Sequence, residues 1–175
     1  GIPGDSLQIE GGFYEINGRR GIGNLNDQEM LSNYRGEYPQ GIYNTYPFDY
    51  RLGWNFINFG PLYLPRKGDP LPIDTSAVRI YYKMIKYESG LNLQEREGQV
   101  WCGDSLVERY TFRTNWYFMG GDNMWNSQDS RYLGPIPEEF IIGKATLILT
   151  AKDPETKAYR WRRFFTRIRK EGKNR

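Results

Sequence analysis

The sequence predicts a mostly β fold that carries one helix-containing insertion. Aromatic residues make up 16% of the 175 residues, with 14 Tyr and 5 Trp, and aromatic side chains favour strands. Short apolar runs of strand length alternate with clusters of Gly, Pro, Asn and Asp, as they do in antiparallel sheets. Only one segment has clear helical periodicity. A chain of this length can bury a sizeable core as one domain or as a core with a large insertion.

The chain opens with short antiparallel strands. Leu7 and Ile9 alternate with polar residues, and a second apolar run covers residues 13–16. That run leads into Asn17-Gly18, a dipeptide that tolerates the positive φ angles of a tight hairpin turn. We therefore expect antiparallel pairing within the first twenty residues.

Residues 21–73 form the least regular part of the sequence. They are rich in Gly, Pro, Asn and Tyr and show little periodicity, which predicts long loops and irregular strands. The one exception is a helical turn expected around Asp27 to Tyr34.

An amphipathic helix is predicted over residues 75–89. Asp74-Thr75 provides an N-terminal capping signal, and Gly90 provides the stop. Apolar residues recur at i, i+3, i+4 and i+7, and this stripe is expected to contact the core. Its members are Val78, Tyr81, Tyr82 and Ile85.

Strand-length runs after the helix predict five more strands. They cover residues 99–102, 107–113, 115–119, 141–151 and 159–165. Together with the opening strands they predict a β core made of residues 1–20 and 106–175. Residues 21–105 would then be an insertion subdomain that contains the helix.

The composition excludes several kinds of chemistry. The chain has no histidine, which removes Ser-His and Cys-His nucleophile pairs and histidine metal ligands. Cys102 is the single cysteine, so no disulfide can form within the chain, and we expect it to be a small core or strand residue. The longest mostly apolar runs, at 116–119 and 145–151, have strand length and fall short of a membrane span.

Positive charge is concentrated at the C-terminal end. Residues 152–175 hold ten Lys/Arg against three acidic residues, although the whole chain has a net charge of only +3. Aromatic and aliphatic side chains, namely Tyr159, Trp161, Phe164, Phe165 and Ile168, interrupt this basic segment. Such a segment could face nucleic acid, face anionic lipid headgroups, or form a last strand and a solvated end. No nucleic-acid motif accompanies it, which favours the last alternative.

Residues 121–134 form the most distinctive segment of the sequence. Within fourteen positions they combine turn formers, carboxylates, hydroxyls and an arginine, and such loops hold side chains in defined directions. The alternative is a surface turn held by one Asp/Arg pair. The candidate residues are Gly121, Asp122, Asn123, Ser127, Asp129, Ser130, Arg131 and Gly134.

No cofactor or metal is predicted. A calcium loop that began at Asp122 would need an oxygen ligand at 124, a glycine at 127 and a glutamate at 133, but these positions hold Met, Ser and Leu. Residues 18–23 are glycine-rich but lack both the Lys-Ser/Thr ending of a phosphate-binding loop and a helix after it.

Three groups of motifs together resemble a known enzyme family. The first group is GIPGD at 1–5 with ING at 16–18. The second group runs from YFMGGDN at 117–123 through Ser127, DSR at 129–131, Gly134 and Pro137 to GKA at 143–145. The third and weaker group is NFGP at 58–61 with PRKG at 65–68. These segments resemble signal peptidase I, the serine endopeptidase that removes signal peptides. Met124 and Gly120 depart from the family pattern.

The resemblance implies acyl transfer by a serine nucleophile with a lysine general base. In the family both residues lie upstream of the Gly-x-Pro-Gly-Asp turn, so both would precede Gly1, and these 175 residues alone are expected to be inactive. Ser127 would hold the lysine amine, because a hydroxyl both accepts and donates hydrogen bonds. By the same resemblance, an Asp129–Arg131 ion pair, Asp122 and Asn123 would fix the loop, and Pro3, Gly4 and Asp5 would belong to the scaffold. A non-catalytic binding or assembly module on the same scaffold is the alternative.

The resemblance also implies a fold, partners and a location. The core would be a signal-peptidase/LexA-like β-barrel, and no cofactor would be needed. The substrates would be signal peptides of preproteins, bound as an added strand and cleaved after small residues. The domain would lie on the extracytoplasmic face of the bacterial cytoplasmic membrane, with the basic aromatic C-terminal end near the lipid surface, and nucleic acid would not be a partner.

Overall fold

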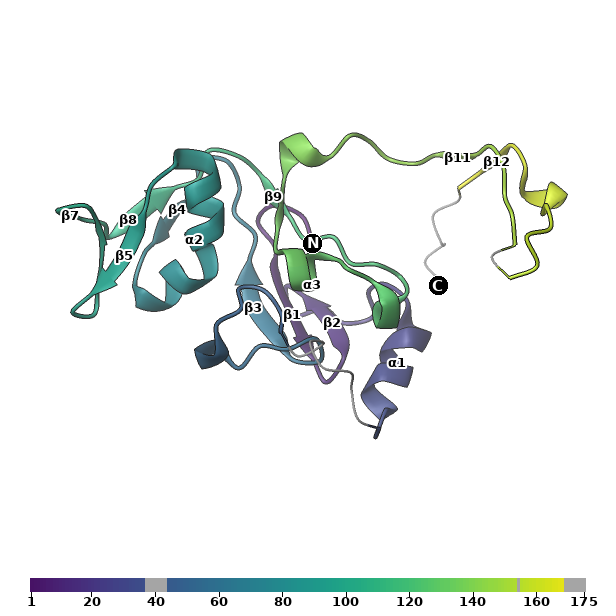
Figure 1. The fold of residues 1–175 in the computed structure, drawn as a ribbon, viewed down its shortest axis with the longest axis horizontal. Coiled ribbons are helices and arrows are strands. Elements are labelled where there is room, and N and C mark those ends of the chain that lie inside the picture. The colour runs from purple at the N-terminus through teal and green to yellow at the C-terminus, as the bar shows by residue number, and fades with distance from the viewer. Residues whose placement is uncertain (37–43, 154, 169–175) are drawn as a thin grey trace. The chain divides into compact units, whose positions relative to one another are not determined.

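The computed structural model describes residues 1–36, 44–153 and 155–168, and it confirms a β-rich fold with a helix-bearing part (Figure 1). The chain divides into two compact units, Gly1–Phe140 and Ile141–Arg175. The strands lie in separate sheets of two or three strands, and none of the sheets in the described part closes into a barrel. No helix among the described residues has the length and apolar character needed to cross a bilayer.

A three-stranded sheet in the order β2-β1-β3 holds the N-terminal segment. β1 (Ser6–Glu10) pairs antiparallel with β2 (Phe13–Ile16) and with β3 (Phe59–Tyr63), as Figure 1 shows. After β2 the chain turns through Asn17 (φ 52°) and Gly18 (φ 75°), so the predicted tight turn is confirmed. β3 lies in the part of the chain for which the sequence predicted an insertion.

The helical turn expected around Asp27 to Tyr34 is present as the longer helix α1 (Leu25–Asn33). Asn24 caps it by accepting a hydrogen bond from the Asp27 amide. Gln28 is fully buried and links the helix to the sheet, since it accepts from the Tyr14 amide at 3.0 Å and donates to the Ile22 carbonyl at 2.7 Å. A buried glutamine of this kind interrupts the apolar periodicity that reveals a helix in sequence.

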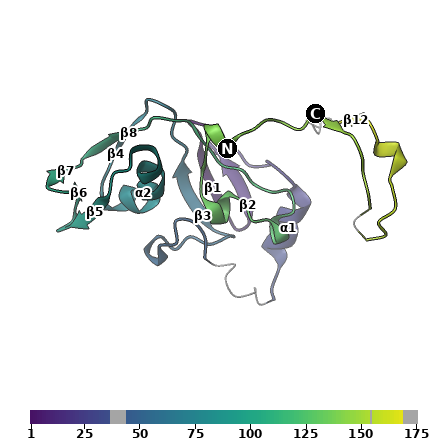
Figure 2. The ribbon, with the colours of Figure 1, turned by 45° about the horizontal axis from the view of Figure 1, so that its top comes forward.

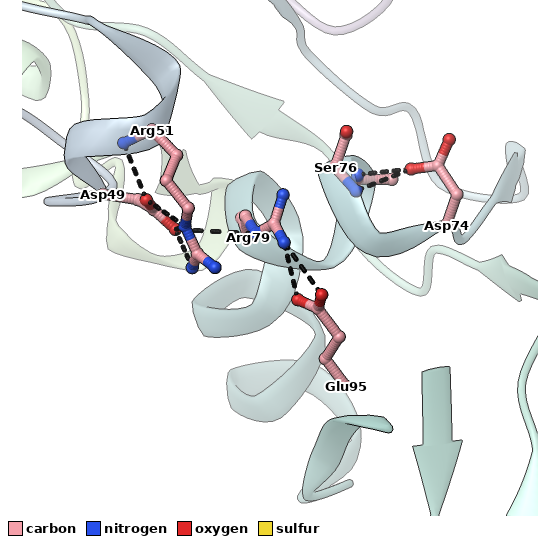
Figure 3. Close-up of polar contacts among 7 residues, drawn as sticks. Asp49, Arg51, Asp74, Ser76, Arg79 and Glu95 are labelled. Carbon is pink, nitrogen blue, oxygen red and sulfur yellow. Dashed lines mark hydrogen bonds and ion pairs between the residues drawn. The ribbon is translucent and has the colours of Figure 1, made fainter. Parts of the chain in front are cut away.

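The predicted helix over 75–89 is confirmed as α2 (Thr75–Ser89). Asp74 accepts hydrogen bonds from the amides of Ser76 and Ala77, as Figure 3 shows for its end of the helix. Gly90 ends the helix with φ 71°. The face that packs into the core consists of Val78, Tyr81, Met84 and Ile85, whereas Tyr82 is only half-buried.

A chain of charges joins α2 to its surroundings. Arg79 on α2 lies 3.7 Å from the Asp49 carboxylate and 2.8 Å from that of Glu95 (Figure 3). The Arg51 side chain binds the same Asp49 carboxylate and lowers the pKa of Asp49 to about 2. Arg79 and Asp49 are half-buried, whereas their partners Arg51 and Glu95 are exposed.

Three further sheets complete the first unit. β5 (Leu93–Arg96), β6 (Gln99–Cys102) and β7 (Ser105–Leu106) form one sheet, and β5 and β6 pack against α2 in the view of Figure 2. β4 (Pro70–Pro72) pairs with β8 (Arg109–Thr111), and β9 (Trp116–Tyr117) pairs with β10 (Ile136–Pro137). The strand predicted over 99–102 is confirmed, and Cys102 is half-buried within it. The runs at 107–113 and 115–119 contain only the shorter strands β8 and β9.

The Glu88 carboxylate ties the end of α2 to the chain that leads into β9. It accepts hydrogen bonds from the Tyr110 hydroxyl at 3.0 Å, the Arg113 amide at 2.8 Å, the Thr114 amide at 3.2 Å and the Trp116 indole at 2.6 Å. A carboxylate can accept about four hydrogen bonds, so these four donors occupy all of its acceptor positions. The start of β9, and hence of the loop that follows it, is thereby held against the helix.

The second unit differs most from the prediction. Of the strand predicted over 141–151 only β11 (Leu147–Ile148) is present, and it pairs with β12 (Thr166–Arg167). The strand predicted over 159–165 is wrong, because the chain there forms a single bridge at Tyr159 and the short 3₁₀-helix η4 (Trp161–Arg163). The rings of Tyr159, Trp161 and Phe164 pack on one another with centroids 4.8–5.9 Å apart, an arrangement without the two-residue alternation of a strand.

Candidate functional site

The loop over residues 121–134 connects β9 to β10 and contains two short helical segments. They are η2 (Met124–Asn126) and α3 (Ser130–Leu133). The buried Ser130 closes the base of the loop, because its amide donates to the Met119 carbonyl at 2.9 Å and its hydroxyl accepts from the Met119 amide at 3.0 Å. The loop is therefore an ordered structure anchored at both ends.

The ion pair expected between Asp129 and Arg131 is present and buried. Arg131 Nε lies 2.8 Å from Asp129 Oδ1 and Arg131 Nη2 lies 2.9 Å from Oδ2, a two-point pairing of a guanidinium whose side chain is 0% exposed. Asp129 also accepts from the Gly121 amide at 2.9 Å, and Arg131 donates to the Met124 carbonyl at 2.9 Å. Burial acts to raise the pKa of Asp129, but the hydrogen bonds from Arg131 and Gly121 outweigh it and leave this pKa lowered.

Ser127 sits directly against Gly121. A Cβ atom built on Gly121 would lie 2.0 Å from Ser127 Oγ and 2.7 Å from Ser127 Cβ, so any side chain at 121 would displace the serine. Ser127 is half-buried, and among the described residues no hydrogen bond involves its hydroxyl. The Ser127 hydroxyl therefore keeps its capacity to bind a further group.

Gly134 ends α3 in a conformation that other residues rarely adopt, with φ 88°. A Cβ atom at this position would lie 2.5 Å from the ring of Tyr46, which is almost fully buried. The Tyr46 amide in turn donates to the Arg131 carbonyl at 2.8 Å. The Tyr46 ring leaves no room for a side chain at position 134, which explains why the residue that ends the loop is a glycine.

The turn formed by residues 1–5 is held by Asp5. This carboxylate accepts from the Ile2 amide at 2.9 Å and from the Asn17 side chain at 2.7 Å, which joins the turn to the end of β2. Gly4 has φ 90°, and a Cβ there would lie 2.1 Å from the Arg66 guanidinium. Gly1 and Phe118 exchange two backbone hydrogen bonds of 3.0 Å, so the first residue lies beside the chain that enters the loop.

A cavity of about 290 Å³ brings these segments together. Its walls come from residues that are far apart in the sequence. They are Gly1, Leu7, Tyr14, Ile16, Ile22, Gly23, Asn24, Phe118, Met119, Gly120, Gly121, Asp122 and Met124. Most of this lining is apolar or glycine; Ser127 is not part of it, but it contacts Gly121, which is. Gly1 and the serine-bearing loop, which the sequence connects only through the resemblance, are therefore parts of one site.

The remaining predicted residues, Asp122, Asn123 and Pro3, make few contacts or are exposed. Asp122 and Asn123 are exposed, and Asn123 precedes η2 without a side-chain capping hydrogen bond. The contact recorded for Asp122 is through its carbonyl, which accepts from the Asn24 side chain at 3.4 Å. Pro3 accepts a hydrogen bond from Arg66 at 3.3 Å through its carbonyl. Asp122 and Asn24 both contribute to the cavity wall, whereas Asn123, Pro3 and Arg66 do not line it.

Sequence reasoning missed Tyr14 and Gln28. Both are buried: Tyr14 lines the cavity, and the Gln28 side chain accepts a hydrogen bond from the Tyr14 amide. No local pattern identifies them, since Tyr14 occupies an ordinary inward position of a strand. Asn24 had the weaker signal of a helix-capping residue.

The chain belongs to the signal peptidase family, peptidase S26, whose model matches residues 1–150. It is similar to signal peptidase I of Buchnera aphidicola, with 65% identity over 34 residues, 19% of this chain and 11% of that protein. It also resembles signal peptidase I of Haemophilus influenzae, with 42% identity over 57 residues, which are 30% of this chain and 16% of that protein. Its identity to signal peptidase I of Aquifex aeolicus is 44% over 45 residues, which are 26% of this chain and 18% of that protein. The matches span less than a fifth of the length of these relatives. No solved structure matches significantly.

Proposed function

We propose that this chain is part of a signal peptidase I that cleaves signal peptides from secreted preproteins, and that Ser127 positions its lysine general base. The observation that carries the proposal is the shared cavity of Gly1 and Gly121, together with the close contact between Gly121 and the Ser127 hydroxyl. By the family pattern, the nucleophilic serine and the lysine precede Gly1 in the complete protein. The lysine would enter this cavity from the side of Gly1.

The cavity suits a lysine that works as a base. Such a lysine must be neutral, so it needs an apolar pocket that lowers the pKa of its amine. A carboxylate nearby would raise that pKa, but Asp129 is already engaged by Arg131 and by the Gly121 amide, and Asp122, which contributes to the cavity wall, is exposed to the screening solvent. Ser127 adds a neutral hydroxyl that can accept from the ammonium and donate to the amine, so the amine is held in both states of protonation.

In the reaction, the lysine amine would take the proton of the nucleophilic serine as that serine attacks the scissile carbonyl. The ammonium would then return the proton to the leaving amine, and water would hydrolyse the acyl-enzyme. The residues of this chain provide the frame: Gly121 leaves room for Ser127, and Ser130 and the Asp129–Arg131 pair fix the loop. Asp5, Gly4 and Pro3 hold the turn that follows the base.

The substrate would lie as an extended strand beside this frame, with small residues before the cleaved bond. The complete protein would be anchored in the bacterial cytoplasmic membrane with this domain on its extracytoplasmic face. The basic, aromatic C-terminal segment favours contact with anionic lipids, because Trp161 is 71% and Phe165 is 74% exposed. The partition into a core of 1–20 and 106–175 and an insertion of 21–105 remains part of the proposal.

Replacement of Ser127 in the complete gene product tests this function. Ser127→Ala should lower kcat for preprotein cleavage about 10- to 100-fold, because the base loses a positioning partner. Ser127→Ala should also shift the acidic limb of the pH profile of kcat, since the environment of the lysine amine changes. Ser105→Ala, in exposed β7, is the matched control and should retain wild-type turnover. Wild-type turnover by Ser127→Ala would remove Ser127 from the mechanism.

The alternative function is a non-catalytic binding or assembly module on the same scaffold. The gene sequence upstream of Gly1 and a cleavage assay with the complete protein separate the two. An upstream Ser-Met-x-Pro motif and a Lys-Arg pair, together with cleavage, would establish the peptidase. Their absence together with retained binding of signal peptides would establish the module.

A further inference from the structure

Tyr46 joins the helix α2 to the loop over residues 121–134. Its side chain is 1% exposed, and its hydroxyl donates a hydrogen bond to the Ile80 carbonyl of α2. The Lys83 amine, also on α2, lies 5.8 Å from the centre of the Tyr46 ring. Burial raises the pKa of Tyr46, so the phenol stays protonated and remains a donor at physiological pH. The hydroxyl is therefore a fixed link to the helix.

Tyr46 also contacts the end of the loop, through its backbone and its ring. Its amide donates a hydrogen bond to the Arg131 carbonyl at 2.8 Å. Its ring fills the space beside Gly134, where an added Cβ atom would lie 2.5 Å from a ring carbon. One buried residue thus binds α2 through its hydroxyl and the α3 segment of the loop through its amide and ring.

The start of the loop is tied to the same helix by Glu88. The Glu88 carboxylate, near the end of α2, accepts from the Trp116 indole of β9 at 2.6 Å and from the Thr114 amide at 3.2 Å. Since β9 leads into the loop and α3 leaves it, α2 holds both of its ends. Groups supported by a rigid element keep their geometry best, so this arrangement suits a loop that must hold a side chain in place.

Arg131 connects Tyr46 to Ser127 through a short series of contacts. Its carbonyl accepts from the Tyr46 amide, and its guanidinium binds Asp129 at 2.8 and 2.9 Å. Asp129 in turn accepts from the Gly121 amide at 2.9 Å, and the Ser127 hydroxyl packs against Gly121. All five residues are buried or half-buried. A displacement of the α3 segment would therefore move the serine hydroxyl as well.

We propose that Tyr46 is a positioning residue, which holds Ser127 in place for the lysine base by tying the loop over residues 121–134 to α2. This inference rests on the proposed function for the role of Ser127. It gives α2 a task in catalysis, although none of the residues named above as lining the cavity belongs to this helix. Misplacing a catalytic group by about 1 Å can lower a rate about 100-fold, so the loss of one link should have a measurable effect.

Tyr46→Phe in the complete gene product tests the proposal, because it removes the hydroxyl and keeps the ring against Gly134. It should lower kcat for preprotein cleavage about 3- to 10-fold and change KM less than about twofold. It should also shift the acidic limb of the pH profile of kcat in the same direction as Ser127→Ala.

Tyr81→Phe is the matched control. Tyr81 is a buried tyrosine of α2 whose hydroxyl donates to the Tyr63 carbonyl of β3 at 3.1 Å, so its replacement removes the same kind of hydrogen bond without touching the loop. It should lower the urea midpoint of unfolding about as much as Tyr46→Phe does, because each variant loses one buried hydrogen bond. Its kcat and pH profile should match those of the wild type.

A double-mutant cycle separates positioning from a general loss of stability. If Tyr46 acts through Ser127, then Tyr46→Phe should lower kcat by less than about twofold more in a Ser127→Ala protein. Independent effects would multiply instead, and that result would overturn the inference. Wild-type kcat in Tyr46→Phe, or equal losses of kcat in Tyr46→Phe and Tyr81→Phe, would overturn it too.

Hydrogen exchange tests the inference without reference to cleavage and so separates it from the proposed function. The amides of Gly121 and Ser130 are hydrogen-bonded at the base of the loop, to Asp129 and to the Met119 carbonyl. They should exchange about tenfold faster in Tyr46→Phe than in the wild type, and at the wild-type rate in Tyr81→Phe. Faster exchange without any cleavage would leave the link to α2 standing and remove the peptidase activity. Unchanged exchange would overturn the inference even in an active enzyme.

Discussion

The hydroxyl of Ser127 occupies space that only a glycine at position 121 leaves open. Because a Cβ at 121 would lie 2.0 Å from that oxygen, Gly121→Ala must push the serine aside or distort the loop. We expect a loss of about 1–3 kcal/mol in the free energy of unfolding, as for overpacked sites. We also expect a fall in cleavage rate comparable to that of Ser127→Ala.

Urea titration and a cleavage assay of the complete protein measure these two effects of Gly121→Ala. Gly143→Ala is the control, because a Cβ at 143 meets no atom within 4 Å and no positive φ is required there. A Gly121→Ala protein as stable and as active as the wild type would show that the loop is more adaptable than this packing implies.

The Asp129–Arg131 pair predicts an acid-sensitive contribution to stability. The folded pKa of Asp129 is lowered, so its contribution is complete above the unfolded pKa near 4 and is lost as the pH falls through the folded value. Asp129→Asn leaves Arg131 buried without its counter-charge and should cost about 3–5 kcal/mol at pH 7. That difference from the wild type should shrink as the pH falls below about 4.

Unfolding free energies at pH 7 and pH 3 measure this dependence. Asp104→Asn, an exposed carboxylate in a turn, should change the free energy by less than about 0.5 kcal/mol at either pH. An Asp129→Asn cost that is the same at both pH values would contradict the assignment of acid sensitivity to this pair.

At the scale of elements, α2 depends on its cap. Asp74 satisfies two amides at the start of the helix, so Asp74→Ala should cost about 1 kcal/mol in thermal or urea unfolding. Asp74→Asn keeps an acceptor of the same shape and should stay close to the wild type. Equal losses in both variants would mean that charge, and not the hydrogen bonds, stabilises this end of the helix.

The elements that sequence analysis predicted well are those whose signals are local. The hairpin turn at Asn17-Gly18 and the helix between Asp74 and Gly90 are determined by neighbouring residues, and both are present. The strands predicted over 141–151 and 159–165 had suitable composition, but a strand also needs a partner. Near Tyr159 the aromatic rings pack on one another instead.

At the scale of the whole molecule, the C-terminal unit predicts binding to anionic membranes. Vesicles with anionic lipid should bind the protein more strongly than neutral vesicles, and salt should weaken the binding. Replacing both Arg162 and Arg163 by Glu should lower the affinity at least about tenfold, and Trp161→Ala should weaken it further. Tyr50→Ala, which removes an exposed aromatic of the first unit, is the control and should have no effect. Equal binding to neutral and anionic vesicles would refute the lipid contact.

The sequence by itself indicated the family through motifs that keep their residue order, and the β-rich class through composition; the capped helix and the Asp129–Arg131 pair were predictable because each depends on residues a few positions apart. Only the tertiary structure decided that Gly1, Tyr14 and Gly121 line one cavity, that Gly121 makes room for Ser127, and that the strands form small separate sheets. These features arise when distant segments pack together, and the contacts between such segments leave no fixed spacing in the chain. The burial of the Tyr14 hydroxyl belongs to the second group, since burial is a property of the folded environment.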